Sequence, residues 1–131
     1  DTDEGGRNLE GALLASSVPQ ERIVRIWSSR GRESEDLVSP EALARAVNAV
    51  LAETTGEQPP RIEASQIRGH PRWDRVMAWC DTQGIAHPSK VQVARHLVDP
   101  LDGNRAAQPI HDPAAADHLR SLHTQVVAYF G

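Results

Sequence analysis

The sequence predicts a mainly α-helical protein: a small helical domain of four to five helices that includes a helix-turn-helix-like hairpin. Apolar residues recur at the three- and four-residue spacing of a helix in most segments between turns. Serine or aspartate followed by proline, a common start of a helix, precedes two of these segments. A strand-like alternation appears only in residues 22–27, so little in the sequence favours a sheet.

Composition places the chain among soluble globular proteins. Its 131 residues are typical of one domain, and it has 39% hydrophobic and 24% charged residues. Cys80 is the only cysteine, which excludes an internal disulfide framework and suits a reducing compartment. No apolar run approaches the roughly 18–20 residues that span a membrane, so we expect a cytoplasmic protein with no membrane contact. We expect residues 1–8 to be a flexible acidic lead and residues 9–131 to form a single helical domain.

The first quarter of the chain contains two weaker helix candidates. Residues 8–17 predict a short helix. Residues 18–29 start with Pro19 near a first helical turn, and their apolar residues lie three and four positions apart. We favour a helix over a strand for this second segment, and a polar loop follows it.

The clearest predicted element is a helix over residues 39–56. Ser39 is a natural N-cap, Pro40 suits the first helical position, and Gly56 ends the helix. The apolar residues of one face are expected to lie in the core; they are Leu43, Val47, Val50 and Leu51.

Residues 61–98 contain the predicted hairpin. Residues 61–71 predict one or two helical turns, and residues 73–83 form an amphipathic helix that ends at Gly84. A turn then leads to Ser89, which can cap a helix over residues 90–98. We expect this last helix to have a broad apolar face made of Val91, Val93, Ala94, Leu97 and Val98.

The C-terminal part consists of a long irregular segment and a helix. Residues 99–113 contain three prolines and predict a long loop, which is often functional. Asp112 and Pro113 then predict the start of a final helix. Its apolar stripe consists of Leu119, Leu122, Val126, Tyr129 and Phe130.

Charge is unevenly distributed although the net charge is −4. Residues 61–98 carry six lysines and arginines against three acids, whereas acids dominate the rest of the chain. Lys90 is the only lysine among 14 basic residues, which indicates a GC-rich bacterial genome. A basic block that coincides with the hairpin is a weak indication of nucleic-acid binding.

We therefore expect a DNA-binding domain, either a regulator or an accessory domain of a replication, transfer or recombination protein. A helix-turn-helix places its second helix in the major groove, and here that helix starts with polar residues suited to phosphates and base edges. The residues expected to contact DNA are Arg68, Arg72, Arg75, Lys90, Gln92 and Arg95.

The alternative is a helical protein-interaction module without nucleic-acid binding, in which the hairpin is an ordinary pair of core helices. Its partner is another protein or the rest of a longer chain, since the sequence does not begin with methionine.

Other chemistries find little support, and we expect neither an enzyme nor a cofactor. His111 and Asp112 form an adjacent pair of the kind that metal-dependent hydrolases use, but no further ligands are identifiable. His118 and His123 are five residues apart and diverge around a helix. Cys80 lies on an apolar stripe, where a thiol packs as a small hydrophobic group, and no phosphate-binding glycine loop is present.

Overall fold

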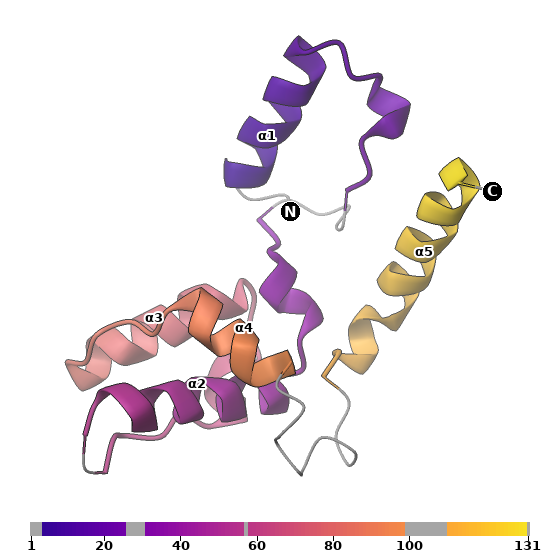
Figure 1. Ribbon diagram of the computed structural model, residues 1–131. Helices are drawn as coiled ribbons and strands as arrows, with labels where there is room; N and C mark the ends of the chain where they lie inside the picture. The colour runs from indigo at the N-terminus through magenta and orange to yellow at the C-terminus, as the bar shows by residue number, and fades with distance from the viewer. Residues whose placement is uncertain (1–3, 26–30, 57, 99–109, 131) are drawn as a thin grey trace. The chain divides into compact units, whose positions relative to one another are not determined.

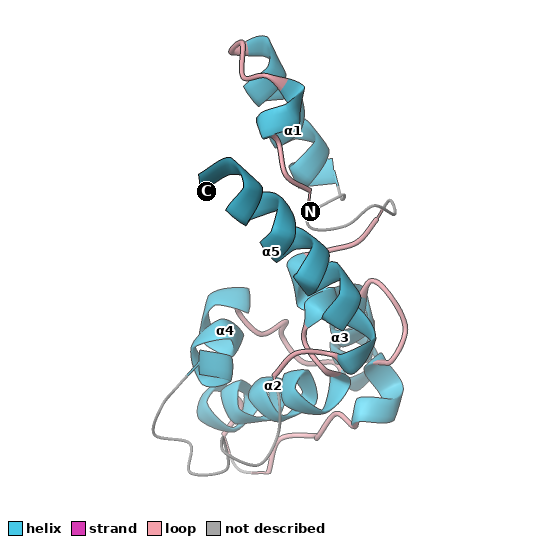
Figure 2. Ribbon diagram, turned by 90° about the vertical axis from the view of Figure 1, so that its right-hand side faces the viewer, coloured by secondary structure: helices cyan, strands magenta, loops and turns pink. Residues whose placement is uncertain are grey.

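The computed structural model describes residues 4–25, 31–56, 58–98 and 110–130. Within these ranges the chain forms helices and no named β-strand, so the predicted all-α fold is confirmed (Figures 1 and 2). The α-helices are α1 (Glu4–Ala15), α2 (Pro40–Thr54), α3 (Arg72–Gln83), α4 (Lys90–Val98) and α5 (Ala116–Phe130). Short 3-10 helices are η1 (Gln20–Arg22), η2 (Ser34–Leu37), η3 (Ala64–Ile67) and η5 (Pro113–Ala115).

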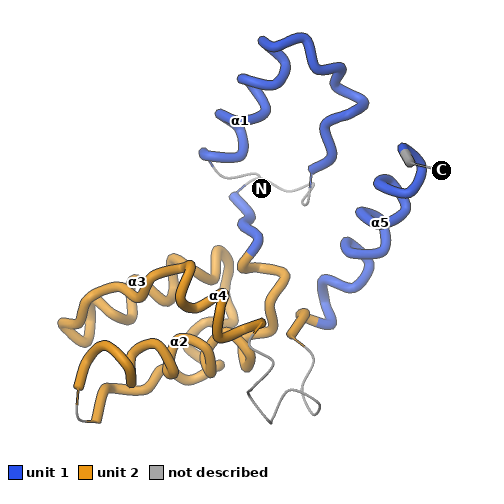
Figure 3. Tube along the Cα trace, viewed as in Figure 1, with its two compact units in different colours: residues 1–34, 113–131 blue, residues 35–112 orange. Residues whose placement is uncertain are grey.

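The chain divides into two compact units (Figure 3). One unit joins residues 1–34 to residues 113–131, and the other comprises residues 35–112. The single domain expected from residue 9 onward stays a prediction, since compact units of one chain can belong to one domain. In addition, α1 begins at Glu4, inside the segment expected to be a flexible lead.

Helix α2 is the centre of the unit formed by residues 35–112. The Ser39 hydroxyl oxygen accepts a hydrogen bond from the backbone N–H of Ala42 at 3.2 Å, and Pro40 occupies the first turn. Both features satisfy or remove the unpaired N–H groups of a helix start. Leu43, Val47 and Val50 are fully buried, so the predicted N-cap and core face are confirmed.

The other elements of this unit pack around α2. Helix α4 runs closely alongside α2, while η3 contacts both α2 and α3. Each element contributes apolar side chains to one contiguous core. Its members beyond α2 are Ile62, Ile67, Trp73, Val76, Trp79, Cys80, Val93 and Leu97.

Helices α3 and α4 both form, but the segment between them doubles back along α3 (Figure 1). Gly84 ends α3 in the left-handed conformation with φ of 66°, and the N–H of Ile85 donates to the Cys80 carbonyl at 3.1 Å. The Lys90 ammonium at the start of α4 lies 5.3 Å from the ring centroid of Trp73, in the first turn of α3. Helix α4 therefore begins beside the start of α3 and not at its end.

The broad apolar face predicted for α4 is wrong in part. Val93 and Leu97 enter the core, but Val91 and Val98 are 62% and 65% exposed. Helix α4 packs mainly against α2, so it buries one narrow stripe, and that stripe faces α2.

The unit that joins the two ends of the chain contains little buried apolar surface. No side chain of α1 is buried, and the same holds for the described side chains of α5. Glu10 and Arg25 form a bidentate ion pair, in which the guanidinium lowers the pKa of the Glu10 carboxyl. After η1, residues 23–25 are not helical, so the helix predicted over residues 18–29 is wrong in its described part.

Two further points concern the limits of the described chain. Residues 26–30, and residues 99–109 of the loop predicted over 99–113, lie outside the described residues. None of the described helices has the length and apolar character of a membrane span.

Candidate interaction surface

The structure does not gather the six residues predicted to contact DNA onto one surface. They lie in different environments: one is buried, two form ion pairs with carboxylates, and three are exposed.

Arg72 is the buried member, with 3% of its surface exposed. Its Nη1 donates to the backbone carbonyls of Asp36 at 2.7 Å and Val38 at 2.6 Å, and its Nη2 pairs with the Asp112 carboxylate. The Asp36 carboxylate, itself fully buried, accepts the Arg72 backbone N–H at 2.9 Å and lies 2.8 Å from Nδ1 of His70. A buried charge is stable only with such partners.

The prediction that Arg72 contacts a phosphate finds no support in this arrangement, because the guanidinium is used inside the protein. The network links three separate segments of the chain. Beside it, the backbones of Val38 and His111 form an isolated antiparallel bridge, with the Asp112 N–H donating to the Leu37 carbonyl at 2.7 Å. Arg72 thus stabilises the closure of the unit at its two ends.

Lys90 and Arg68 each interact with a carboxylate. Lys90 Nζ lies 3.0 Å from the Glu35 carboxylate in addition to its position over Trp73. Arg68 lies 3.5 Å from the Glu41 carboxylate, and both of these side chains are largely exposed. An exposed ion pair is weak, so Arg68 remains accessible, whereas Lys90 is held at the junction of α3 and α4.

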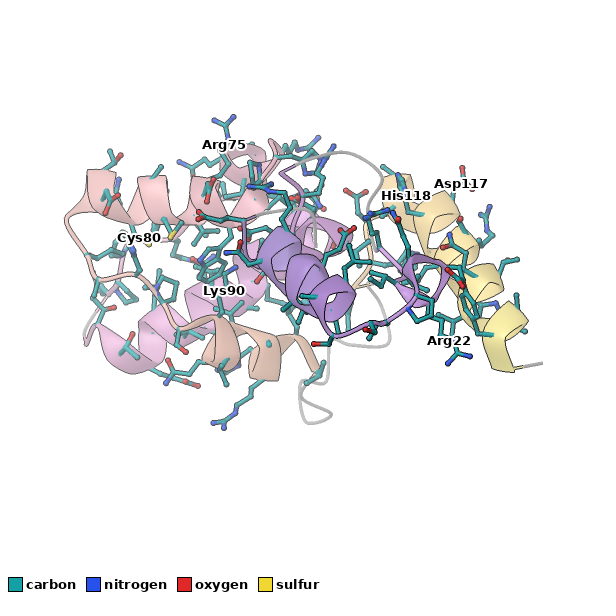
Figure 4. All side chains as sticks on the ribbon, turned by 90° about the horizontal axis from the view of Figure 1, so that it is seen from above. Arg22, Arg75, Cys80, Lys90, Asp117 and His118 are labelled. Atoms are coloured by element: carbon teal, nitrogen blue, oxygen red, sulfur yellow. The ribbon has the colours of Figure 1, made fainter. Side chains whose placement is uncertain are left out.

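The remaining three residues are exposed and come from two helices. Arg75 projects from α3, with its guanidinium beside Gly69, and Figure 4 shows it pointing away from Lys90. Gln92 and Arg95 lie on the exposed side of α4. Among the predicted set, only Gln92 and Arg95 share a helix face.

The exposed side of α4 also carries apolar residues that the sequence placed in the core. We call Val91, Gln92, Ala94, Arg95 and Val98 the outer face of α4; all five are exposed. Val91 and Val98 are seven positions apart, so they are aligned to within about 20° along the helix. Ala94 lies between the two valines, three residues after Val91. The three side chains form an apolar line along the helix, and Arg95 lies beside it. Helical periodicity predicted one broad apolar face for α4 and did not distinguish its buried part from its exposed part.

The groups considered for catalysis or metal binding do not form a site. The Asp112 carboxylate is paired with Arg72, and His111 is exposed. In the described part of the chain, no three histidine, cysteine or acidic side chains cluster as metal ligands. Burial raises the pKa of the Cys80 thiol, with a further contribution from the Asp81 charge, so this thiol is a poor nucleophile.

Comparison with known proteins gives no match: the chain resembles no protein-family model, no curated protein and no solved structure. The arguments for function therefore rest on the residues and their geometry.

Proposed function

We propose that this chain is a helical protein-interaction module that binds an amphipathic, acidic partner helix on the outer face of α4. The observation that carries the proposal is the 62% and 65% exposure of Val91 and Val98 on one line of a well-packed helix. Apolar residues at three- and seven-residue spacings are the anchors by which helices dock into one another.

The energetic argument concerns the two valines and Arg95. Full burial of a valine side chain contributes about 1.5–3 kcal/mol, so covering this line favours association. Arg95 lies beside the valines and has no carboxylate partner among the described residues. A partner helix with a carboxylate next to its apolar stripe would match both features, and charge complementarity would fix its orientation.

The test compares two variants for binding to a synthetic amphipathic helical peptide that bears glutamates beside a leucine stripe. Val91→Glu with Val98→Glu should abolish binding. The two introduced carboxylates repel the acidic peptide, and the loss of the valine side chains removes the apolar contact. Val127→Glu, at an exposed position of α5, is the control and should bind as the original chain does. Amide shifts on the bound protein should map to α4. Absence of binding to the original chain, or shifts confined to other helices, would contradict the proposal.

DNA binding is a second candidate, with a smaller set of residues than the sequence indicated. It is favoured by Arg75, Gln92 and Arg95, which are exposed and form no ion pair within the described residues. Affinity for duplex DNA should then fall as salt rises, and Arg95→Ala should reduce the slope by about one. Arg68, already paired with Glu41, is the comparison and should contribute less. A protein that binds no DNA at low salt would eliminate this candidate and leave the peptide result untouched.

Both candidates are binding functions without catalysis. The free thiol of Cys80 supports a reducing compartment, and we place the protein in the bacterial cytoplasm as part of the proposal.

A further inference from the structure

We infer that α5 is a self-association element, through which two copies of this chain form a dimer. The inference starts from the spacing of four apolar residues along α5. Leu119, Leu122, Val126 and Tyr129 follow one another at intervals of three, four and three residues. This is the spacing of the contact line between two supercoiled helices. We call these four residues the α5 seam.

In the described chain the C-terminal half of the seam is exposed and its N-terminal half is partly covered. Val126 and Tyr129 are 38% and 50% exposed, while Leu119 and Leu122 are half-buried. A 15-residue helix is only marginally stable alone in water, and its stability comes mainly from burying its apolar side. Helix α5 therefore gains from a partner along its length.

The charges on α5 indicate which partner fits. The positions that flank the seam carry neither a carboxylate nor a lysine or arginine; they are Ala116, His118, His123 and Gln125. Asp117 and Arg120 lie away from the seam and form an ion pair with each other. Gln125 donates a hydrogen bond to the Ser121 hydroxyl at 3.2 Å within the same helix. A partner with charged flanks would find no opposite charges here.

A second α5 meets these requirements. It presents the same apolar seam and the same flanks without fixed charge, so no like charges oppose one another across the contact. Contacts between identical surfaces close around a two-fold axis, which limits the assembly to a dimer. The outer face of α4, by contrast, includes Arg95 and favours an acidic partner. The dimer therefore does not depend on the function proposed for α4.

Two adjacent valines provide a matched test. Val126 lies on the seam, whereas Val127 is turned away from it by about 100° around the helix and is 49% exposed. In sedimentation equilibrium of the full chain, from micromolar to millimolar concentration, we expect a monomer–dimer equilibrium. Val126→Glu should weaken association by about tenfold or more, since one desolvated charge costs at least 1.4 kcal/mol. Val127→Glu should change it by less than about threefold.

Circular dichroism of each variant controls for helix loss, and Tyr129→Glu provides a second seam variant. A chain that stays monomeric at all concentrations would overturn the inference. So would equal effects of Val126→Glu and Val127→Glu, or an association that both variants leave intact. The double α4 variant, Val91→Glu with Val98→Glu, should leave the dimer unchanged. Failure of the dimer is thereby distinguishable from failure of peptide binding.

Discussion

Arg72 and Arg75 lie one turn apart on α3, yet their environments are opposite. Arg72 is buried against Asp36 and Asp112, and Arg75 is exposed. Nothing in the spacing of charged residues separates these two roles, because the acceptors of Arg72 come from segments about 35–40 positions away along the chain. The sequence could therefore indicate a basic block but could not show which arginines reach its surface.

This contrast leads to a prediction about stability. Arg72→Ala should lower the free energy of unfolding by about 3–5 kcal/mol, because it leaves the Asp112 carboxylate and the backbone carbonyls of Asp36 and Val38 without their cationic donor. Arg75→Ala should change the same quantity by less than about half a kcal/mol, as expected for a surface position. Urea denaturation of both variants measures the difference. Similar losses for the two would contradict the role assigned to Arg72.

Cys80 allows a prediction at the same scale. Its side chain is fully buried, and burial raises the pKa of its thiol, so the reactive thiolate is scarce at neutral pH. A thiol reagent should react slowly with the folded protein and rapidly after denaturation. Because the raised pKa favours the protonated thiol in the folded state, its contribution to stability is lost as pH rises above the ordinary thiol range. Equal reaction rates before and after denaturation would indicate an exposed thiol.

At the scale of elements, local signals predicted helix positions well and helix faces less well. The Ser39 cap and the Gly84 stop are both confirmed, because each depends on contacts within a few residues. The exposed valines of α4 were missed, since burial depends on the neighbour against which a helix packs. The segment around Pro19 was misassigned because apolar spacing alone cannot distinguish a helix from an extended segment with the same residues.

Gly84 supports a prediction about the end of α3. Its φ of 66° lies in the left-handed region, and a Cβ at this position would meet no atom within 4 Å. The cost of Gly84→Ala is therefore backbone strain alone, about 1 kcal/mol in the free energy of unfolding. Gly84→Asn should cost less, because asparagine tolerates this conformation. Thermal unfolding of both variants tests the order, and a more stable alanine variant would contradict the left-handed ending.

At the scale of the whole molecule, the two compact units differ in how they bury apolar surface. Every residue of the buried core cluster lies between residues 35 and 112. The other unit combines both ends of the chain, and the described side chains of its two α-helices are not buried. The sequence did not indicate this division, because the apolar stripe of α5 resembles a core stripe. Among the described residues, only its incomplete burial distinguishes it from one.

The position of the core leads to the last prediction, that residues 35–112 fold independently of the ends of the chain. The Arg72 network and the Val38–His111 bridge both lie within this segment, so a fragment of residues 35–112 keeps all of these contacts.

Leu51→Ala should lower the free energy of unfolding by about 2–5 kcal/mol in the full chain and in the fragment alike, because Leu51 is 1% exposed and the core around it belongs to this unit. Val91→Ala, at an exposed site, should cost little in either. Chemical denaturation of the four variants, followed by tryptophan fluorescence from Trp73 and Trp79, measures both effects. A fragment that unfolds without cooperativity, or a Leu51→Ala loss that appears only in the full chain, would show that the ends of the chain are part of the core.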